Sequence, residues 1–296
     1  MNDRCWTVLR RWAVAALLPV LAACGAANVE EGLLPEGPPE GEVVALDYDA
    51  AGNRLLEAYP HALQQSADGG ATWQPVPLPA SAQEGRIVSV AISDSSGVLY
   101  LAGPGVGVLR SEDAGRTWAA LNEELPSQEV VAFATHADQP RTLYAFVPEE
   151  GIHRSEDAGE TWTRMDGGPD GPIRQFFHSD MEGSMQSGWL FAATPEGVRR
   201  SMDCFCGWRP TGELPQGAEV LALAYDPEQP EQVYASTTAG LFRSTDGGES
   251  WKAVSTDGPE LTTLTFDRSG ALYATTREGA LLRSVDQGQS WERVGA

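Results

Sequence analysis

Short stretches of alternating apolar and polar residues recur along the chain from about residue 42 to its end. Residues 220–225 and 261–266 alternate with a period of two and contain β-branched and aromatic residues, a pattern that predicts strands. Each stretch is followed by a turn rich in Asp, Pro or Gly, a second short strand such as 233–237, a glycine turn and a third strand such as 241–244. The pattern therefore predicts an all-β domain built from repeated hairpins.

A motif of the form Ser-x-Asp-x-Gly-x-Ser/Thr-Trp follows the third strand in five places, and a degenerate sixth copy at 201–208 keeps only the Ser, the Asp and the Trp. The six serines, at 66, 111, 155, 201, 244 and 284, are 45, 44, 46, 43 and 40 residues apart. The tryptophan should open a fourth strand, and four strands in about 40 to 46 residues form one blade of a β-propeller. We therefore expect a six-bladed β-propeller of four-stranded antiparallel blades over residues 42–296, closed by packing of blade one against blade six. The motif residues are Asp68 and Trp73, Asp113 and Trp118, Asp157 and Trp162, Asp203 and Trp208, Asp246 and Trp251, and Asp286 and Trp291.

The motif has a structural interpretation. Asp and Ser side chains bond to backbone amides in tight turns, glycine supplies positive φ, and the tryptophan ring can be buried between neighbouring blades. In these features the motif resembles the Asp-box, or BNR, repeat, and the resemblance covers residues 42–296. The alternative is that the six aspartates bind calcium. One carboxylate per hairpin falls short of the roughly six to eight oxygens that Ca²⁺ takes, so we favour the structural role.

The N-terminus carries a targeting signal. Three arginines within the first eleven residues precede an apolar run over 13–23, which is too short for a membrane-spanning helix of about 20 residues. Such a run is typical of a secretory signal peptide. It ends in Leu-Ala-Ala-Cys at 21–24, which resembles the lipobox of bacterial lipoproteins and implies cleavage before Cys24 and lipid attachment to Cys24. The alternative is an ordinary signal peptide followed by a chance cysteine.

These features divide the chain into three parts. We expect a lipoprotein signal peptide over 1–23, a lipidated Cys with a flexible linker over 24–41, and the propeller over 42–296. The linker is rich in Pro, Glu and Gly and has no periodic pattern. The expected location is the bacterial cell envelope outside the cytoplasm, either periplasmic or at the cell surface, with the membrane contacted through the lipid anchor only.

The charge balance narrows the range of partners. The chain has 42 Asp and Glu against 20 Lys and Arg, a formal net charge of −22. A chain this acidic repels phosphate backbones, which excludes a general nucleic-acid-binding protein. Hydrophobic residues make up 42% of the chain, enough for a packed core.

Blade four is irregular. Cys204 and Cys206 lie inside its degenerate motif and form a candidate disulfide in a compartment that permits one; a redox or metal role is the alternative. Its loop between the first two strands, over 179–188, is long and could mark a functional insertion or a tolerated loop.

The four histidines show no metal-binding spacing, and no metal, nucleotide or haem motif occurs, so we expect no cofactor.

The resemblance to Asp-box propellers implies that binding sits near the axis, on the face opposite the Asp boxes. The loops between the second and third strands are short and the loops between blades are longer, which predicts a shallow mouth suited to a protein or an extended ligand. The candidate binding-face residues in these loops are Tyr59, His61, Arg86, Glu149, Glu150, Arg174, Glu196 and Arg277.

Two families share the repeat. The sialidases are six-bladed Asp-box enzymes, and resemblance to them implies three convergent arginines, a Tyr nucleophile activated by Glu, and an Asp acid. Arginines precede the motif serine in five blades, which indicates a structural role, and Tyr59 is the one tyrosine outside repeat-equivalent positions. We therefore assign no catalytic residue.

Residues 240–251 also resemble the repeats of the photosystem II assembly and stability factor family, non-catalytic propellers that hold protein clients. That family has seven blades and an arginine patch, whereas this chain has six motifs and is acidic, so we do not expect a photosynthetic client. We expect a monomeric, non-catalytic scaffold for an envelope protein or glycan. The alternative is an exo-acting glycoside hydrolase of the sialidase type.

Overall fold

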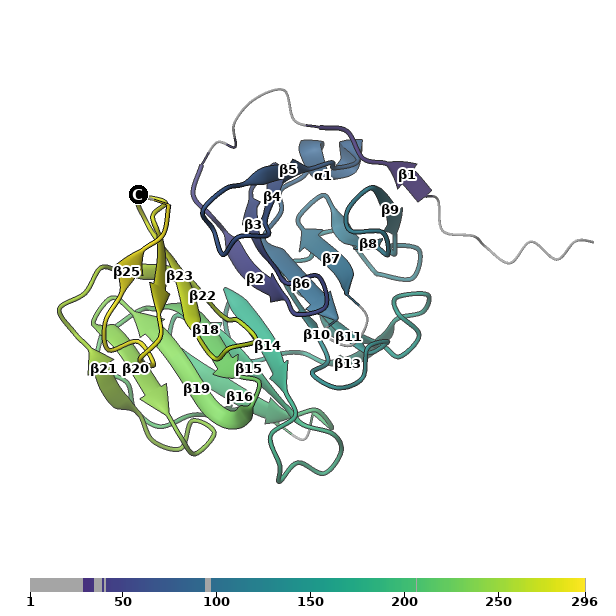
Figure 1. The fold of residues 1–296 in the computed structure, drawn as a ribbon. Coiled ribbons are helices and arrows are strands. Elements are labelled where there is room, and N and C mark those ends of the chain that lie inside the picture. The colour runs from purple at the N-terminus through teal and green to yellow at the C-terminus, as the bar shows by residue number, and fades with distance from the viewer. Residues whose placement is uncertain (1–28, 35–38, 40, 94–96, 206, 296) are drawn as a thin grey trace, which may run out of the picture.

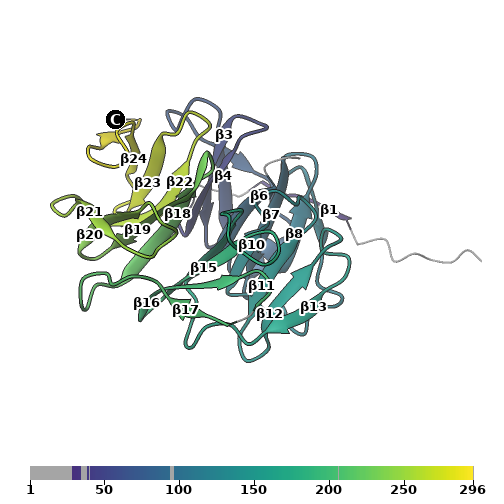
Figure 2. The ribbon, with the colours of Figure 1, turned by 90° about the horizontal axis from the view of Figure 1, so that it is seen from below.

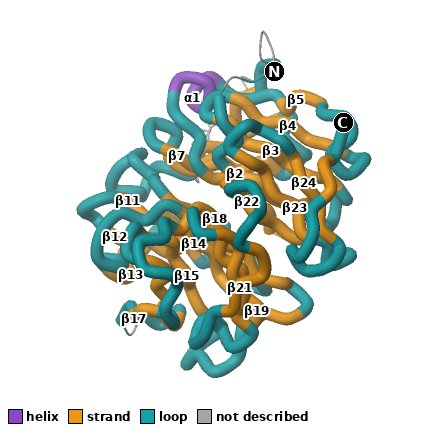
Figure 3. Tube along the Cα trace, turned by 90° about the vertical axis from the view of Figure 1, so that its left-hand side faces the viewer, coloured by secondary structure: helices purple, strands orange, loops and turns teal. Residues whose placement is uncertain are grey.

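The computed structural model describes residues 29–34, 39, 41–93, 97–205 and 207–295. These residues form six antiparallel sheets that follow one another around a common centre (Figures 1 and 2). Strands and loops make up nearly all of the described chain, with one short helix, α1 (Ala80–Glu84), between blades one and two (Figure 3). The prediction of an all-β, six-bladed propeller with four-stranded blades is confirmed. None of the described helices has the length and apolar character needed to cross a membrane.

Each blade runs from an inner to an outer strand in chain order. The first three blades comprise β2 (Ala45–Asp49), β3 (Arg54–Tyr59), β4 (Ala62–Ser66) and β5 (Gln74–Val76); β6 (Ser89–Ser93), β7 (Val98–Gly103), β8 (Gly107–Ser111) and β9 (Thr117–Ala120); and β10 (Ala132–Thr135), β11 (Leu143–Val147), β12 (Gly151–Ser155) and β13 (Thr163–Asp166). The last three comprise β14 (Gln175–Ser179), β15 (Trp189–Thr194), β16 (Gly197–Met202) and β17 (Arg209–Pro210); β18 (Val220–Asp226), β19 (Gln229–Thr237), β20 (Gly240–Ser244) and β21 (Lys252–Ser255); and β22 (Leu261–Phe266), β23 (Leu272–Thr276), β24 (Leu281–Ser284) and β25 (Glu292–Arg293).

The hydrophobic core lies between the blades. Middle strands are buried on both faces, and each apolar cluster joins two neighbouring blades, as when Tyr100 of blade two packs against Phe133 of blade three with ring centroids 5.6 Å apart. The ring closes in the same way, since Leu46 and Leu55 of blade one pack with Tyr273 and Leu281 of blade six. Closure by packing of blade one against blade six, expected from the sequence, is what the structure has.

The regular Asp boxes share one hydrogen-bond pattern. In the first, Ser66 Oγ donates to Asp68 Oδ1 (2.7 Å) and accepts from the Gly70 amide (2.8 Å). Asp68 Oδ1 also accepts from the Thr72 amide (2.9 Å), and Asp68 Oδ2 accepts from the Thr72 hydroxyl (2.6 Å). Gly70 has a φ of +96°, and a Cβ there would lie 2.1 Å from Leu281 Cδ2, so the box also needs glycine for its close approach to the neighbouring blade six.

The box tryptophans tie each blade to the one before it. Trp118 Nε1 donates to the Pro77 carbonyl (2.8 Å), and Trp162 Nε1 donates to the Leu121 carbonyl (2.9 Å). Both rings are buried, so each buries a large apolar surface at a seam while its N–H is satisfied.

The segment before blade one contains a short strand. Residues Val29–Glu31 form β1, which pairs antiparallel with β9 and adds a fifth strand to the outer edge of blade two. Leu33 then forms an isolated bridge with Leu78. The prediction of a flexible linker over 24–41 therefore does not hold for these residues. Cys24 lies outside the described residues.

Candidate functional site

The inner strands surround a channel on the propeller axis. It has a volume of about 1010 Å³ and is lined by residues of β2, β6, β10, β14, β18 and β22 and of the loops at both ends of these strands. The wall mixes apolar side chains with hydroxyl groups, including Val88, Ser89, Thr135 and Thr262. A channel of this size and mixed chemistry is a candidate binding site.

An aromatic stack forms part of the channel wall. The Phe177 ring lies against those of Phe191 and Tyr225, with ring centroids 5.1 Å apart in both pairs. Phe177 and Tyr225 line the channel and are partly buried, and the stacking holds their positions in the wall.

Three of the predicted binding-face residues line this channel. Arg86, Arg174 and Arg277 contribute from blades two, four and six at the end opposite the Asp boxes. Arg174 is ion-paired with Glu219, and Arg277 is 3.1 Å from Glu260, so carboxylates of the chain itself neutralise two of the three arginines.

The other five predicted residues do not line the channel. Glu196 is 2.8 Å from Arg199, an ion pair on its own blade, and His61 is exposed. Glu149 and Glu150 lie in the turn before β12. Tyr59 turns instead to Glu57 on the same strand.

Glu57 and Tyr59 form a buried acid–phenol pair. The Tyr59 hydroxyl donates to Glu57 Oε2 (3.1 Å), and Glu57 is 5% exposed. Burial raises the pKa of Glu57 to about 7, although the Tyr59 hydrogen bond opposes the rise, and burial also raises the pKa of Tyr59. Neither residue lines the channel that holds Arg86, Arg174 and Arg277. Tyr59 and Glu57 therefore do not form a sialidase constellation with these three arginines.

The Glu57 carboxyl predicts a pH-dependent effect on stability. Its folded pKa of about 7 exceeds its ordinary value of 4.5, so stability is full below pH 4.5 and is lost as the pH rises through 7. Glu57→Gln keeps a neutral group in place and is expected to raise the free energy of unfolding at pH 8 by about 3 kcal/mol, with little effect at pH 4.5. Urea denaturation at both pH values measures this. An equal effect at pH 4.5 and pH 8 would contradict the assignment.

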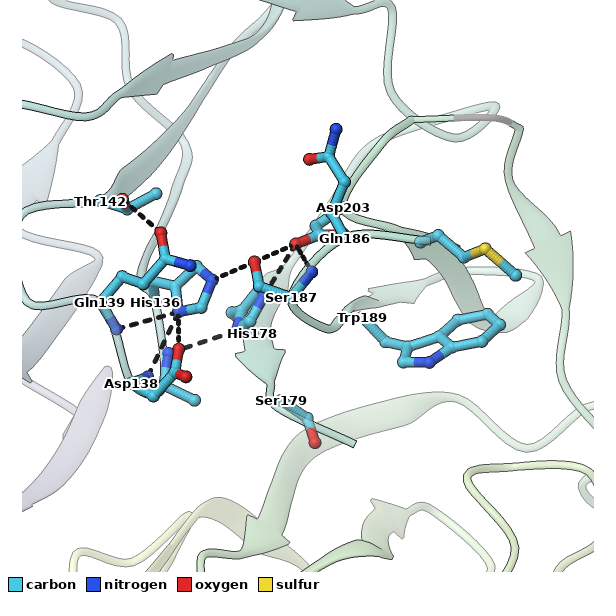
Figure 4. A network of polar contacts seen from close by, with 12 residues as sticks. His136, Asp138, Gln139, Thr142, His178, Ser179, Gln186, Ser187, Trp189 and Asp203 are labelled. Carbon is cyan, nitrogen blue, oxygen red and sulfur yellow. Dashed lines mark hydrogen bonds and ion pairs between the residues drawn. The ribbon is translucent and has the colours of Figure 1, made fainter. Parts of the chain in front are cut away.

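A second buried polar cluster, which the sequence did not predict, lies between blades three and four (Figure 4). His136, just after β10, stacks on His178 of β14 with ring centroids 3.7 Å apart. Ser187, from the long loop of blade four, lies between His136 Nε2 (2.8 Å) and Asp203 Oδ2 (2.5 Å). Both histidines also line the channel at its Asp-box end.

Asp203 occupies the Asp position of the degenerate box but has a different role. Its Oδ2 accepts from the Ser187 amide (2.9 Å) and hydroxyl, whereas the regular aspartates bind within their own turn. Burial alone would raise the pKa of Asp203, but interactions with His178 and Ser187 outweigh it and lower the pKa to about 2. The box aspartate has become an anchor for the insertion loop.

The backbone holds the histidines in place. His136 Nδ1 accepts from the Asp138 and Gln139 amides (3.2 and 3.1 Å), and His178 Nδ1 accepts from the Ala137 amide (3.2 Å). Burial, followed by the neighbouring His178, lowers the pKa of His136 to about 4. The ring is therefore neutral at neutral pH, which makes the stacked arrangement tolerable.

The cluster is not arranged for serine catalysis. In a hydrolytic triad the serine gives its proton to histidine and the histidine is oriented by the carboxylate. Here His136 Nδ1 accepts from two backbone amides, so its Nε2 carries the ring proton and donates to Ser187, whose hydroxyl donates in turn to Asp203.

The same three side chains are the candidate metal donors of the described chain. Ligand atoms of His136, His178 and Asp203 lie within 4.8 Å of one another. However, the Ala137 amide donates to His178 Nδ1, which leaves the ring proton on Nε2, 3.8 Å from Asp203 Oδ2. The Ser187 hydroxyl also occupies the space between His136 and Asp203. The contacts therefore suit a hydrogen-bonded lock between blades better than a metal centre.

The regular boxes do not offer a calcium cage. Each carboxylate is engaged by its own turn, and in Asp68 hydrogen bonds from Thr72 and Ser66 lower the pKa to about 2. A cation would have to displace these donors, and each box supplies one carboxylate. The Asp-box residues thus act as turn anchors.

The degenerate box also contains a disulfide-bonded cysteine. Cys204 is in a disulfide, and Cys206 lies outside the described residues. The sequence signal for the whole irregular region was the loss of the box glycine and hydroxyl residues together with the long loop over 179–188.

Comparison with known proteins agrees with this geometry. A sequence model of the BNR/Asp-box repeat matches residues 242–253. The chain is a six-bladed propeller whose turn motif is similar to the BNR/Asp-box repeat. Residues 39–185 of this propeller match a second model, that of the photosynthesis system II assembly factor YCF48. No curated protein matches its sequence.

Solved structures share the fold of this propeller at low identity. YCF48 from Cyanidioschyzon merolae is 18% identical, with a TM-score of 0.58 and coverage of 90% of this chain and 88% of that one. YCF48 bound to D1 peptide is 19% identical, with a TM-score of 0.57 and coverage of 90% and 84%. The GH74 xyloglucanase from Xanthomonas campestris is 19% identical, with a TM-score of 0.58 and coverage of 86% and 47%. The chain thus spans about half the length of the GH74 enzyme.

Proposed function

We propose that this propeller is a non-catalytic binding protein that holds an extended segment of a partner protein at its axial channel. The observation that carries the proposal is the channel itself, a volume of about 1010 Å³ whose wall combines an aromatic stack, hydroxyl groups and apolar residues. Aromatic side chains in the wall supply contact area at little entropic cost, and hydroxyl groups pair with a peptide backbone.

The open end of the channel suits a polypeptide. It carries charges of both signs, with arginines from blades two, four and six beside Glu42 and Glu219. A rim of mixed charge favours a polar, extended chain over a uniformly anionic or cationic ligand. YCF48, which shares the fold, has been solved bound to D1 peptide, and this supports peptide binding by a propeller of this shape.

We propose a lipid on Cys24 as the membrane attachment, in the cell envelope outside the cytoplasm. The support is the sequence over 13–24, a short apolar run ending in Leu-Ala-Ala-Cys. In that setting the chain acts as a tethered scaffold for an envelope protein.

Glycoside hydrolysis is the rival function, and likeness of fold to GH74 enzymes is the observation that favours it. Against it, Tyr59 and Glu57 are away from the channel, and two of the three predicted arginines that line it are already paired with glutamates. We expect no turnover by the full-length protein of a panel of fluorogenic glycosides that includes sialosides. Turnover that disappears in the Arg86→Ala variant would establish the enzyme and overturn the scaffold.

Site-specific photo-cross-linking in cells tests the binding function. A photoreactive residue at Val88 or Thr262, both on the channel wall, is expected to form one abundant adduct with an envelope protein. Phe177→Ala should lower the yield of that adduct about tenfold, because it removes an aromatic face from the wall. The control position is Lys252, exposed on the outer strand β21. Equal adducts from Lys252, or none from the channel, would refute the proposal.

A further inference from the structure

Exposed large hydrophobic side chains are concentrated in one short segment. The described chain has five such residues, namely Val29, Leu33, Leu34, Met185 and Val285. Three of them lie within the six residues 29–34, where they are 64%, 59% and 63% exposed. Exposed apolar residues scattered singly need no explanation, but a group in one place marks an interaction surface.

This segment is fixed to the propeller. β1 pairs with β9 over three residues, and the Gly32 amide donates to the Arg116 carbonyl (3.1 Å). Leu33 exchanges two backbone hydrogen bonds with Leu78, each 2.8 Å long. A Cβ at Gly32 would lie 2.7 Å from atoms of Pro77, so the segment lies directly on the seam between blades one and two. Its apolar side chains are therefore held out from a rigid edge.

The distance along the chain to Cys24 is short. Val29, the first residue of β1, is five residues after Cys24. Five residues of fully extended chain reach at most about 17 Å. A lipid on Cys24 would thus keep the outer edge of blade two within about 17 Å of the bilayer surface.

We infer that the segment over residues 29–34 on the outer edge of blade two is a membrane-contacting surface, whose occupant is the lipid bilayer that receives the Cys24 acyl chains. The inference rests on the lipidation proposed above. Val29, Leu33 and Leu34 enter the interface between headgroups and acyl chains, while the exposed Glu30 and Glu31 stay among the headgroups. The chain is acidic, so contact depends on apolar burial and the lipid, not on attraction to anionic lipids.

This contact sets the orientation of the propeller. The outer strands lie at the circumference of the ring, so attachment at the edge of blade two stands the ring on its side, with the channel axis roughly parallel to the bilayer. The end of the channel that carries the arginines is then not covered by the bilayer.

Photo-cross-linking to lipid tests the inference. The full-length protein, purified from membranes with its native Cys24, is reconstituted in vesicles of phosphatidylcholine and phosphatidylglycerol with p-benzoylphenylalanine at Leu33. A second variant carries it at Leu34. Two controls carry it at Lys252, on the outer strand of the opposite blade five, and at Val285, an exposed apolar residue of blade six. Both test positions are exposed, so folding is retained. We expect at least ten times more lipid adduct from positions 33 and 34 than from either control.

Intact mass measured on the same samples shows whether Cys24 is lipidated, and so distinguishes failure of the lipid anchor from failure of the membrane-contacting surface. A diacylated Cys24 together with equal or no adduct at positions 33, 34, 252 and 285 would overturn the membrane-contacting surface and leave the anchor standing. An unmodified Cys24 would overturn the anchor and this inference with it. Adducts at 252 above those at 33 would show that the ring is attached in another orientation, which also overturns the inference.

Discussion

Asp203→Asn is expected to lower the free energy of unfolding by about 3 kcal/mol. The carboxylate is 1% exposed, and its Oδ2 accepts from both the amide (2.9 Å) and the hydroxyl (2.5 Å) of Ser187. An asparagine that turns its NH₂ group toward Ser187 leaves those two donors facing a donor, and one that turns its oxygen there loses the charge that strengthens both bonds. Urea denaturation at pH 7 measures the loss.

Asp157→Asn is the matched control, since it makes the same substitution at the same repeat position. Asp157 bonds within its own turn to Ser155 and Thr161, near solvent. Its replacement should destabilise clearly less, because water can reach the groups that lose their partner. Equal losses in the two variants would mean that Asp203 is an ordinary box residue and that the cluster with His136 and His178 adds nothing to stability.

Trp118→Ala is expected to lower the free energy of unfolding by about 4 kcal/mol. The Trp118 ring is 1% exposed in the core cluster between blades one and two, and its Nε1 donates to the Pro77 carbonyl (2.8 Å). Truncation removes the buried surface, leaves a cavity and strands a buried carbonyl. Trp118→Phe should cost less, because the ring area is largely kept and the hydrogen bond alone is lost. Chemical denaturation of both variants separates the two contributions.

Trp73→Ala supplies the comparison at the seam between blades six and one. Trp73 holds the same box position but is half-buried at the edge of its cluster. We expect Trp73→Ala to lower the free energy of unfolding by about half as much as Trp118→Ala, because the Trp73 ring buries less apolar area on folding. A larger loss for Trp73 would identify the closing seam as the place on which the stability of the ring depends.

The propeller could be predicted because its signals are local and repeated. Each blade carries its own alternating strands, its Asp box and its tryptophan. A copy with a degenerate motif can therefore still be recognised from the pattern of the other five. The Asp and Trp positions of each motif, such as Asp68 and Trp73, could be assigned to the turn and to the start of the fourth strand for the same reason. The residues that line the axial channel could be predicted only in part. Arg86, Arg174 and Arg277 line the channel, whereas Tyr59 is drawn to Glu57 by a hydrogen bond within its own strand.

The residues of the buried polar cluster could not be predicted, because their spacing in the sequence matches no known motif. His136 and His178 are 42 residues apart, one blade length, so they come together only because inner strands of neighbouring blades lie side by side. Ser187 joins them from an insertion, and Asp203 is released to meet it because its own box has lost its glycine and hydroxyl residues. The pairing of β1 with β9 was equally hidden, since a short polar segment acquires a strand conformation from the edge that it meets.

By itself, the sequence determined the blade count, the strand pattern, the turn chemistry and the acidic character of this protein, because each depends on neighbours within about 45 residues. Only the tertiary structure decided which polar groups are buried together, which arginines reach the channel and where the N-terminal segment is held. Those outcomes depend on the rotation between adjacent blades and on which unpaired strand edge remains open, and both are properties of the closed ring.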